Sequence, residues 1–503
     1  MNILIIFLSF LWMVRIVCNI FSWTSLWWIK EYRWDRMRIH LKTKQGKKIL
    51  FPSFRLPPRS FRSLSVVAVS ILLLSVLYMF TDRSILSILF IDLLSFPMTA
   101  GVVFLSYLPM SAYHLWQIFQ ASAIMRKRTD LLVIGITGSY GKTSTKEYLS
   151  TILSEFVPTL KTEASKNSPI GIAEVILKNL KPEHKIFVVE MGAYKLGEIS
   201  AMCRMVRPQI GIILAINPQH QDLFGTIETT MKAKYELVEN LSGKNIVILN
   251  YDDSRVRTLS EWAMRDGKKV WSVRRKEKGK IGEDREAFEI SNSTPTKSRL
   301  SFEIIHNDES LDVSASVVGE HQAINIACAI AAVVAAGMPM DKAVRAVKLI
   351  HPVSHVLEEK LGIHDSVFID DTFNNNPDAA KAAIAVLAMY EKRKILVFAP
   401  MIELGTYAKS SHYDVGCTAA KVCDEVILVG EDWSDDFIKG IRSVNTNCQV
   451  QILSIDKAAT YLRTHIKSKD AVLFKGKSSG LVLSRIIPFT IGIVPRITPS
   501  RPI

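Results

Sequence analysis

Residues 131–153, LLVIGITGSYGKTSTKEYLSTIL, decide the fold of this chain. The apolar run 131–136 predicts a buried strand, the loop TGSYGKT follows it, and a helix is predicted from about Thr143. This order of strand, loop and helix is typical of phosphate binding, because backbone N–H groups and the helix N-terminus converge on the anion. The usual spacing, G-x-x-x-x-G-K-[ST], requires a glycine at 136, but the chain has Ile136 there and its glycine at Gly135.

The loop nevertheless carries the residue types that hold a nucleotide. Lys142 is expected to reach the β- and γ-phosphates of ATP, and the Thr143 hydroxyl to bind Mg²⁺. Gly-Lys-Thr alone occurs by chance in many chains, so this prediction depends on the flanking strand and helix. The predicted nucleotide-binding residues are Thr137, Gly138, Ser139, Tyr140, Gly141, Lys142, Thr143 and Ser144.

From residue 130 onward, short β-rich runs alternate with helical stretches. The predicted strands are 131–136, 186–190, 210–215, 245–249, 366–370, 394–399, 425–429 and 471–474. The alternation predicts an α/β fold with largely parallel sheets. Residues 274–318 break the rhythm and predict antiparallel strands at the edge of the first sheet, and a second α/β unit is expected after about residue 350.

Three apolar segments precede this part, at residues 3–28, 64–81 and 84–108. Each is close to the roughly 20 residues that a membrane-spanning helix needs. The loop 31–63 between the first two holds ten Lys or Arg against two acids, so it is predicted to be cytoplasmic. The expectation is a multi-pass protein of the cytoplasmic membrane with its catalytic part in the cytoplasm. Alternatively, one segment is a buried or re-entrant helix, most readily the third, which contains Asp92 and Pro97.

The composition narrows the class of protein further. A net charge of +15 suits nucleic acid or an anionic membrane surface, and the position of the basic run between apolar segments favours the membrane. The six cysteines form no C-x-x-C pair, which argues against a zinc site or a disulfide framework. The predicted divisions are a membrane region (1–125), a central ATP-binding domain (126–350), a C-terminal domain (351–487) and a proline-rich tail (488–503).

Other motifs follow the loop in a definite order. Glu190 ends a predicted buried strand beside the loop, where a carboxylate can hold a metal ion; His220 and Lys234, each taken alone, suit structural or surface roles better. Taken together, the motifs over about residues 130–485 resemble the Mur ligase family. They are TGSYGKT, VEMGAYKLGEI, H-x-x-x-FG with KAKYEL, G-x-H-x-x-x-N, DDTFNNNP, M-x-ELG and L-x-KG. The family's own loop, T-G-x-x-G-K-[ST], also lacks the usual first glycine.

The resemblance implies a P-loop-type central domain, a smaller Rossmann-like C-terminal domain, and ATP-dependent amide formation through an acyl phosphate in peptidoglycan assembly, with D-alanyl-D-alanine or a similar amino substrate. It implies catalytic roles for Lys142, Lys234 and His220. It implies Mg²⁺ ligands at Thr143, Glu190, His220 and carbamylated Lys234. It places Asn325 on adenine, Asp371 on ribose and His355 at a phosphate-contacting position. It places Asn167, Ser168, Asn374, Asn376, Glu403 and Lys475 at the substrates.

The chain also departs from the family pattern. Membrane segments stand where the family has a domain that grips the UDP end of its substrate. His355 stands where an arginine is expected, Ser168 replaces the second residue of an Asn-Asn pair, and Pro400 and Lys477 alter the region of the amino substrate. A lipid-linked or poly-amino-acid acceptor, and a nucleotide-binding scaffold without catalysis, therefore stay open as alternatives; the exact substrates and the oligomeric state do not follow from the sequence.

Overall fold

The structure is a computed structural model of the chain. It describes residues 3–30, 32, 34–41, 49, 52–82, 84–163, 166–218, 221–276 and 286–487. The chain divides into two compact units, one within residues 1–117 and one within residues 118–492.

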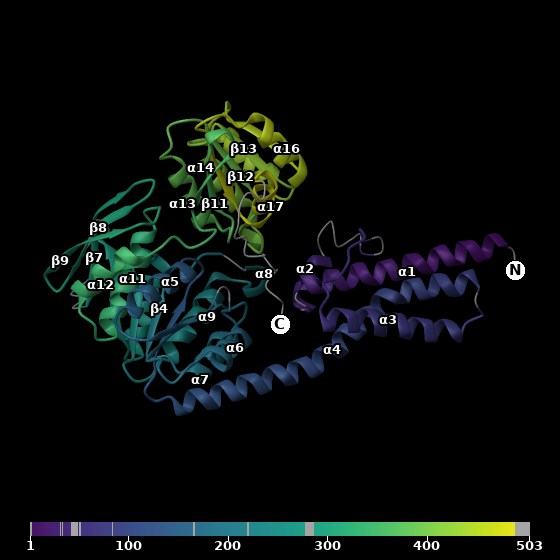
Figure 1. Cartoon of the computed structure of the whole chain (residues 1–503), viewed down its shortest axis with the longest axis horizontal. Coiled ribbons are helices and arrows are strands. Elements are labelled where there is room, and N and C mark those ends of the chain that lie inside the picture. The colour runs from purple at the N-terminus through teal and green to yellow at the C-terminus, as the bar shows by residue number, and fades with distance from the viewer. Residues whose placement is uncertain are drawn as a thin grey trace. The chain divides into compact units, whose positions relative to one another are not determined.

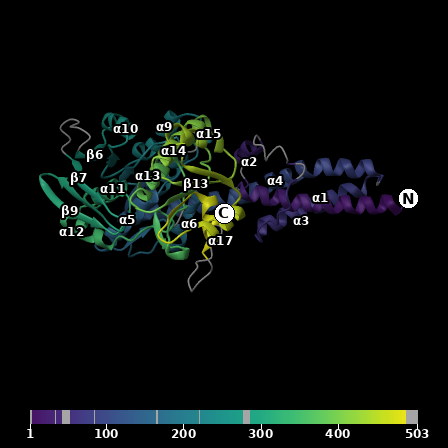
Figure 2. The same cartoon turned by 90° about the horizontal axis from the view of Figure 1, so that it is seen from above.

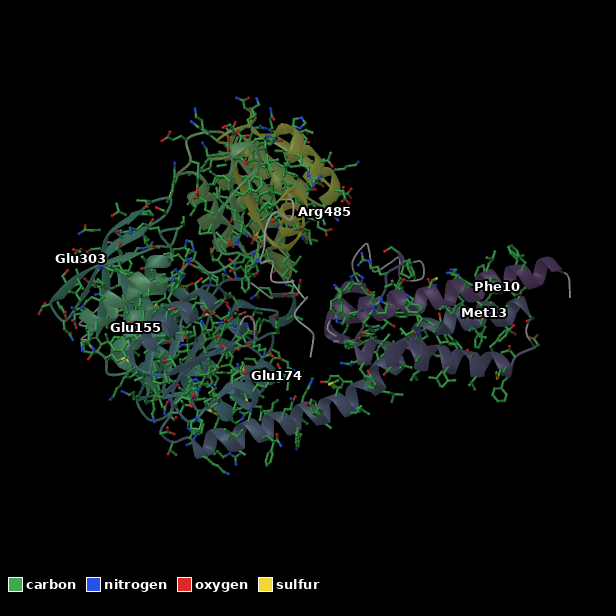
Figure 3. The ribbon with its side chains drawn as sticks, viewed as in Figure 1. Phe10, Met13, Glu155, Glu174, Glu303 and Arg485 are labelled. Atoms are coloured by element: carbon green, nitrogen blue, oxygen red, sulfur yellow. The ribbon has the colours of Figure 1, made fainter. Side chains whose placement is uncertain are left out.

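The first unit is helical (Figures 1 and 2). Its helices are α1 (Ile3–Ile29), α2 (Trp34–Leu41), α3 (Phe61–Met79) and α4 (Ile85–Lys127), of which α4 continues into the second unit. Among the described residues, α1, α3 and α4 are long and apolar enough to cross a membrane. Figure 3 labels Phe10 and Met13 on α1: Phe10 is 64% exposed, whereas Met13 packs against the core of the helices. The helices therefore carry apolar side chains on their outer surface as well as between them.

Helix α4 differs from the predicted third segment, which ended at residue 108. It continues past Pro109 to Lys127, and its last turns bring Ala121 and Met125 into the core of the α/β unit. The charged residue inside it is paired, because Asp92 Oδ2 lies 2.6 Å from Arg15 Nη1 on α1. An opposite charge at this distance offsets the cost of holding Asp92 among apolar helices.

The first α/β sheet has nine strands in the order β2-β3-β1-β4-β5-β6-β7-β8-β9. Neighbouring strands from β2 to β7 are parallel, and β8 and β9 complete the edge as antiparallel strands, as predicted for 274–318. The strands are β1 (Leu132–Thr137), β2 (Thr159–Lys161), β3 (Ile186–Glu190), β4 (Ile210–Ile213), β5 (Ile246–Asn250), β6 (Lys269–Arg275), β7 (Ala287–Pro295), β8 (Leu300–His306) and β9 (Glu309–Ala315).

Helices cover both faces of this sheet because its parallel strands are apolar on both sides. Along β1, Ile134 and Ile136 face one core and Val133 faces the other. The first face packs against α5 (Lys142–Ser154), α11 (Gln322–Ala335) and α12 (Met340–Ala346). The second packs against α6 (Pro169–Asn179), α7 (Glu198–Val206), α9 (Ile227–Glu239) and α10 (Ser254–Arg265).

The second sheet has six strands in the order β10-β11-β15-β12-β13-β14, all parallel except the edge strand β10. They are β10 (Glu358–Leu361), β11 (Val367–Asp371), β12 (Lys394–Phe398), β13 (Glu425–Val429), β14 (Gln449–Leu453) and β15 (Ala471–Lys475). One face packs against α13 (Pro377–Leu387), α14 (Ala408–Ala420) and α15 (Ser434–Val444), and the other against α16 (Ile455–His465) and α17 (Lys477–Ile486).

The order of strands positions the candidate site. Strand β1 lies between β3 and β4, so the chain extends the sheet on both sides of β1 and the strand order reverses there. In open α/β sheets, ligands bind outside the carboxyl ends of the strands at such a reversal. The loop after β1 and Glu190 at the end of β3 both lie at this edge.

Candidate functional site

The loop after β1 is held in place by the segment that follows strand β4. Ser139 N donates to Ala215 O at 2.6 Å, and Asn217 N donates to Ser139 Oγ at 3.0 Å. Gly138 and Gly141 have φ angles of +150° and +82°, a region that side chains disfavour. The backbone therefore turns sharply twice before α5 begins at Lys142.

A glycine is required at Gly141 for a second reason. A Cβ atom there would lie 2.7 Å from Asn325 Oδ1. Asn325 is buried on α11 and donates from Nδ2 to Gln322 Oε1 at 2.9 Å. The predicted adenine contact and the predicted phosphate loop are thus direct neighbours.

Two predicted residues, Thr143 and Asn167, contact Glu190. Thr143 Oγ1 donates to Glu190 Oε2 at 3.1 Å, and Asn167 Nδ2 donates to Glu190 Oε1 at 3.0 Å. Lys142 Nζ donates back to Gly138 O at 2.7 Å, and burial lowers the pKa of Lys142, opposed by Glu190. A hydroxyl and a carboxylate at this point are hard oxygen donors of the kind that Mg²⁺ takes, so the residues present fit this ion.

A small cavity of about 50 Å³ adjoins the loop. It is lined by Gly138, Ser139, Lys142, Asn167, Gly192, Ala193, Tyr194, Phe224, Thr230 and Lys234. Burial, and then the charge of Lys142, lower the pKa of Lys234 to about 7. The structure therefore brings Lys142, Asn167 and Lys234 together around one space; His220 lies outside the described residues.

The remaining loop residues have varied surroundings. Thr137 is buried and its Oγ1 donates to Met191 O at 2.9 Å. Ser144 is buried on α5, on the side of the core. Burial, followed by the charges of Asp378 and Asp253, raises the pKa of Tyr140 to about 12.

A second group lies at the carboxyl ends of β11 and β15. Lys475 Nζ donates to Asp371 Oδ2 at 2.7 Å and to Asn374 O at 2.8 Å. Lys475 is 1% exposed, so its ammonium group is buried with these two acceptors. Three predicted residues are again in contact, here around a buried ion pair.

His355 is paired with the other carboxylate of β11. Its Nδ1 lies 2.8 Å from Asp370 Oδ2, and this hydrogen bond raises the pKa of His355. His355, Glu358 and Asp370 could hold a metal by their spacing. However, Lys360 Nζ lies 2.6 Å from Asp370 and 3.2 Å from Glu358, so an ammonium group already supplies the positive charge.

Three predicted substrate residues have local roles in the backbone. Ser168 caps α6, where its Oγ accepts from Gly171 N at 3.3 Å. Asn376 caps α13, where its Oδ1 accepts from Ala379 N at 3.0 Å. Glu403 has a left-handed backbone conformation, with a φ of +64°, just before η5 (Gly405–Tyr407).

Sequence reasoning missed two buried or half-buried lysines near these groups. Lys146 lies 3.3 Å from Glu190, and its signal was its helical spacing of three residues from Thr143. Lys360 binds Asp370 from the edge strand β10, and no local pattern in the sequence points to that pairing.

Comparison with known proteins agrees with this geometry. Residues 136–333 match the family model of the Mur ligase middle domain, and residues 355–478 match that of the Mur ligase glutamate ligase domain. The UDP-N-acetylmuramoyl-tripeptide–D-alanyl-D-alanine ligase of Escherichia coli strain K12 is 30% identical over 314 residues, 62% of this chain and 67% of the relative. The Synechocystis protein of the same name is 28% identical over 368 residues, 72% of this chain and 76% of the relative.

Solved structures give the same result. MurF from Acinetobacter baumannii aligns with a TM-score of 0.67 at 26% identity, over 74% of this chain and 80% of that one. The MurF ligase of Thermotoga maritima in complex with ADP aligns with a TM-score of 0.63 at 25% identity, over 73% and 83%. The predicted fold class is thereby confirmed, and the chain belongs to the Mur ligase family of ATP-dependent, amide-forming ligases.

Proposed function

We propose that this chain adds D-alanyl-D-alanine to a UDP-N-acetylmuramoyl-tripeptide in peptidoglycan assembly, as a ligase attached to the cytoplasmic membrane by α1, α3 and α4. The observation that carries the proposal is that Thr143, next to Lys142 at the start of α5, binds Glu190 at the carboxyl ends of β1 and β3. Relatives that carry this activity in their names match both α/β domains. The basic loop 31–63 supports a cytoplasmic position for the catalytic part.

The reaction would begin with attack of the tripeptide carboxylate on the γ-phosphoryl group of ATP. Lys142 and the loop N–H groups would stabilise the charge on the transferring group, work that is mainly electrostatic and positional. The amino group of D-alanyl-D-alanine would then attack the acyl phosphate, and collapse of the tetrahedral intermediate would release phosphate. Mg²⁺, held by Thr143 and Glu190, would neutralise phosphate charge.

Lys234 would take part as a carbamate and not as a base. A pKa of about 7 leaves a large fraction of the amine neutral near pH 7, and the neutral amine is the form that reacts with CO₂. The product is a carboxylate-like group that, with Glu190 and His220, would serve a second Mg²⁺. Mass spectrometry of the intact chain under mildly alkaline conditions would detect the added carbamate.

The C-terminal domain would complete the site. Asn325 would contact adenine, Asp371 ribose and His355 a phosphate, and closure of the domain would exclude water from the acyl phosphate. The residues proposed to line the substrates are Asn167, Ser168, Asn374, Asn376, Glu403 and Lys475. The contact of Lys475 with Asp371 would then link the amino substrate side of the site to the nucleotide side.

The test uses the full chain in detergent micelles with ATP, Mg²⁺, UDP-N-acetylmuramoyl-tripeptide and D-alanyl-D-alanine. The expected result is the ligated pentapeptide product in the mass spectrum, absent with Lys142→Ala. If the folded chain binds ATP but forms no product with this acceptor, the proposed acceptor is wrong.

A second candidate is a related ligase that acts on a lipid-linked acceptor. It is favoured by three helices of membrane-spanning length at the N-terminus of a chain of this family. Product from a lipid-linked muramoyl peptide in micelles, without product from the UDP-linked one, would support it. ATP binding without turnover on either acceptor, or on a poly-amino-acid acceptor, would instead indicate a nucleotide-binding scaffold.

A further inference from the structure

We propose that Lys146 is a positioning residue that fixes Glu190 for the metal ion, so that its charge sets both how tightly the site binds a divalent cation and how fast it reacts. The proposal rests on the proposed function, because it assigns Glu190 to the metal. Lys146 itself touches neither nucleotide nor substrate in this account; it acts through the carboxylate.

The burial of Lys146 is the first observation. Its side chain is fully buried, although lysine is among the residues that are rarely buried completely. A buried ammonium group is costly unless carboxylates compensate for it. Lys146 Nζ lies 3.3 Å from Glu190 Oε2 and 3.4 Å from Glu147 Oε1.

The placement of Lys146 on α5 is the second observation. It follows Thr143 by three residues, so both side chains lie on the same face of the helix. Both reach the same oxygen, Glu190 Oε2, while Asn167 binds the other oxygen. If the Thr143 hydroxyl binds the metal ion instead of Glu190, the contacts of Lys146 and Asn167 with the Glu190 carboxylate remain.

The third observation is that the ion pairs of Lys146 continue to Glu147 and Lys161. Glu147 is also bound by Lys161 of β2, so Glu147 is held from both sides. The chain of charges Lys161, Glu147, Lys146, Glu190 alternates in sign from the half-exposed edge of the sheet to the loop. Loss of Lys146 would leave two carboxylates near one another and Glu190 less constrained.

This arrangement predicts opposite effects on binding and rate. In Lys146→Met, the uncompensated negative charge should tighten binding of Mn²⁺ to the nucleotide-free protein by about tenfold or more. The turnover number should fall about 10- to 100-fold, because support of a metal ligand from behind typically has that effect. If Lys146 had a purely structural role, Lys146→Met would lower both the Mn²⁺ affinity and the turnover number.

The measurement is electron paramagnetic resonance of Mn²⁺ bound to the full chain in detergent, together with calorimetry of ATP binding and ligation kinetics. Lys178→Met is the matched control, because the side chain of Lys178 is 64% exposed and its partner Glu174 is also paired with Lys166. Lys178→Met should leave Mn²⁺ affinity and rate as in the wild type. Unchanged or weaker Mn²⁺ binding by Lys146→Met would overturn the proposal.

The double variant Lys146→Met, Glu147→Gln removes the buried Lys146 together with its half-buried partner Glu147, which folded proteins tolerate better than the loss of one partner. It should restore wild-type Mn²⁺ affinity and keep the low rate, because Glu190 is still not held. Recovery of the wild-type rate would refute the positioning role. Mn²⁺ binding is measured without any peptidoglycan precursor. If the chain ligates nothing but Lys146→Met still changes the Mn²⁺ affinity, the proposed acceptor is wrong and the proposed role of Lys146 is supported.

Discussion

Replacing Gly141 by alanine tests the contact between the phosphate loop and helix α11. The substitution places a methyl group 2.7 Å from Asn325 Oδ1, closer than side-chain carbons approach oxygen in folded proteins. Either the loop shifts away from α11 or Asn325 swings out and loses its 2.9 Å hydrogen bond to Gln322. Both outcomes disturb residues that are proposed to hold ATP.

The free-energy effect of Gly141→Ala has two parts. The left-handed conformation, with φ of +82°, costs an alanine about 1–2 kcal/mol, but this cost is present with and without ATP and cancels in the binding free energy. The displaced contact does not cancel. A hydrogen bond to ATP that is lost because Asn325 or the loop is displaced is worth about 1–3 kcal/mol, which corresponds to a Kd for ATP about 5- to 150-fold weaker.

Gly197 provides a matched control. It also precedes a helix, with φ of +87° and ψ of −13° against +82° and −14° at Gly141. No described atom lies within 4 Å of a Cβ at Gly197. Gly197→Ala should therefore lower the melting temperature by a similar few degrees while ATP affinity stays near the wild-type value.

Calorimetric titration of the full chain with ATP distinguishes the two variants. Equal ATP affinity in Gly141→Ala and Gly197→Ala would show that the contact with Asn325 has no part in nucleotide binding. The proposed role of Asn325 would then be wrong.

Three further perturbations follow from the C-terminal domain. Gly440→Ala should destabilise the domain by about 1–3 kcal/mol, because its Cβ would lie 2.1 Å from the backbone oxygen of Tyr413, and thermal denaturation measures this loss. Lys475→Met leaves the 6%-exposed Asp371 without its partner and should cost about 3–5 kcal/mol, most of it recovered when Asp371→Asn is added. The hydrogen bond to Asp370 raises the pKa of His355, so the stability that it contributes is complete below the unfolded pKa of about 6.5 and is lost as pH rises through the folded pKa. His355→Gln should therefore lower the melting temperature more at about pH 6 than at about pH 9.

Central strands were predictable because their sequences alone require burial. Strands β1, β3 and β13 are apolar apart from one polar residue at an end, and each was predicted within two residues of its observed ends. Strands β2, β6, β10 and β14 were missed. Of these, β2, β10 and β14 lie at sheet edges, and an edge strand such as EEKL in β10 gains its structure from its neighbour and not from its own composition.

The site divides in the same way. Lys142, Thr143 and Glu190 were predictable because a phosphate loop and a strand end fix their positions locally. Lys146 was marked only by its spacing of three residues from Thr143, and Lys360 by no local pattern, since each gains its role from a carboxylate brought to it by the folded chain. The end of α4 was also missed, because nothing in its apolar composition shows that its last turns pack against the α/β core.

The central claim is that this chain activates a carboxylate with ATP. The most direct measurement uses UDP-N-acetylmuramoyl-tripeptide with both oxygens of the reacting carboxylate labelled as ¹⁸O, the full chain, ATP, Mg²⁺ and D-alanyl-D-alanine. The account predicts that one ¹⁸O appears in each released phosphate, because that oxygen bridges carbon and phosphorus in the acyl phosphate, and that the other remains in the new amide. Unlabelled phosphate released together with ligated product would contradict the acyl-phosphate mechanism.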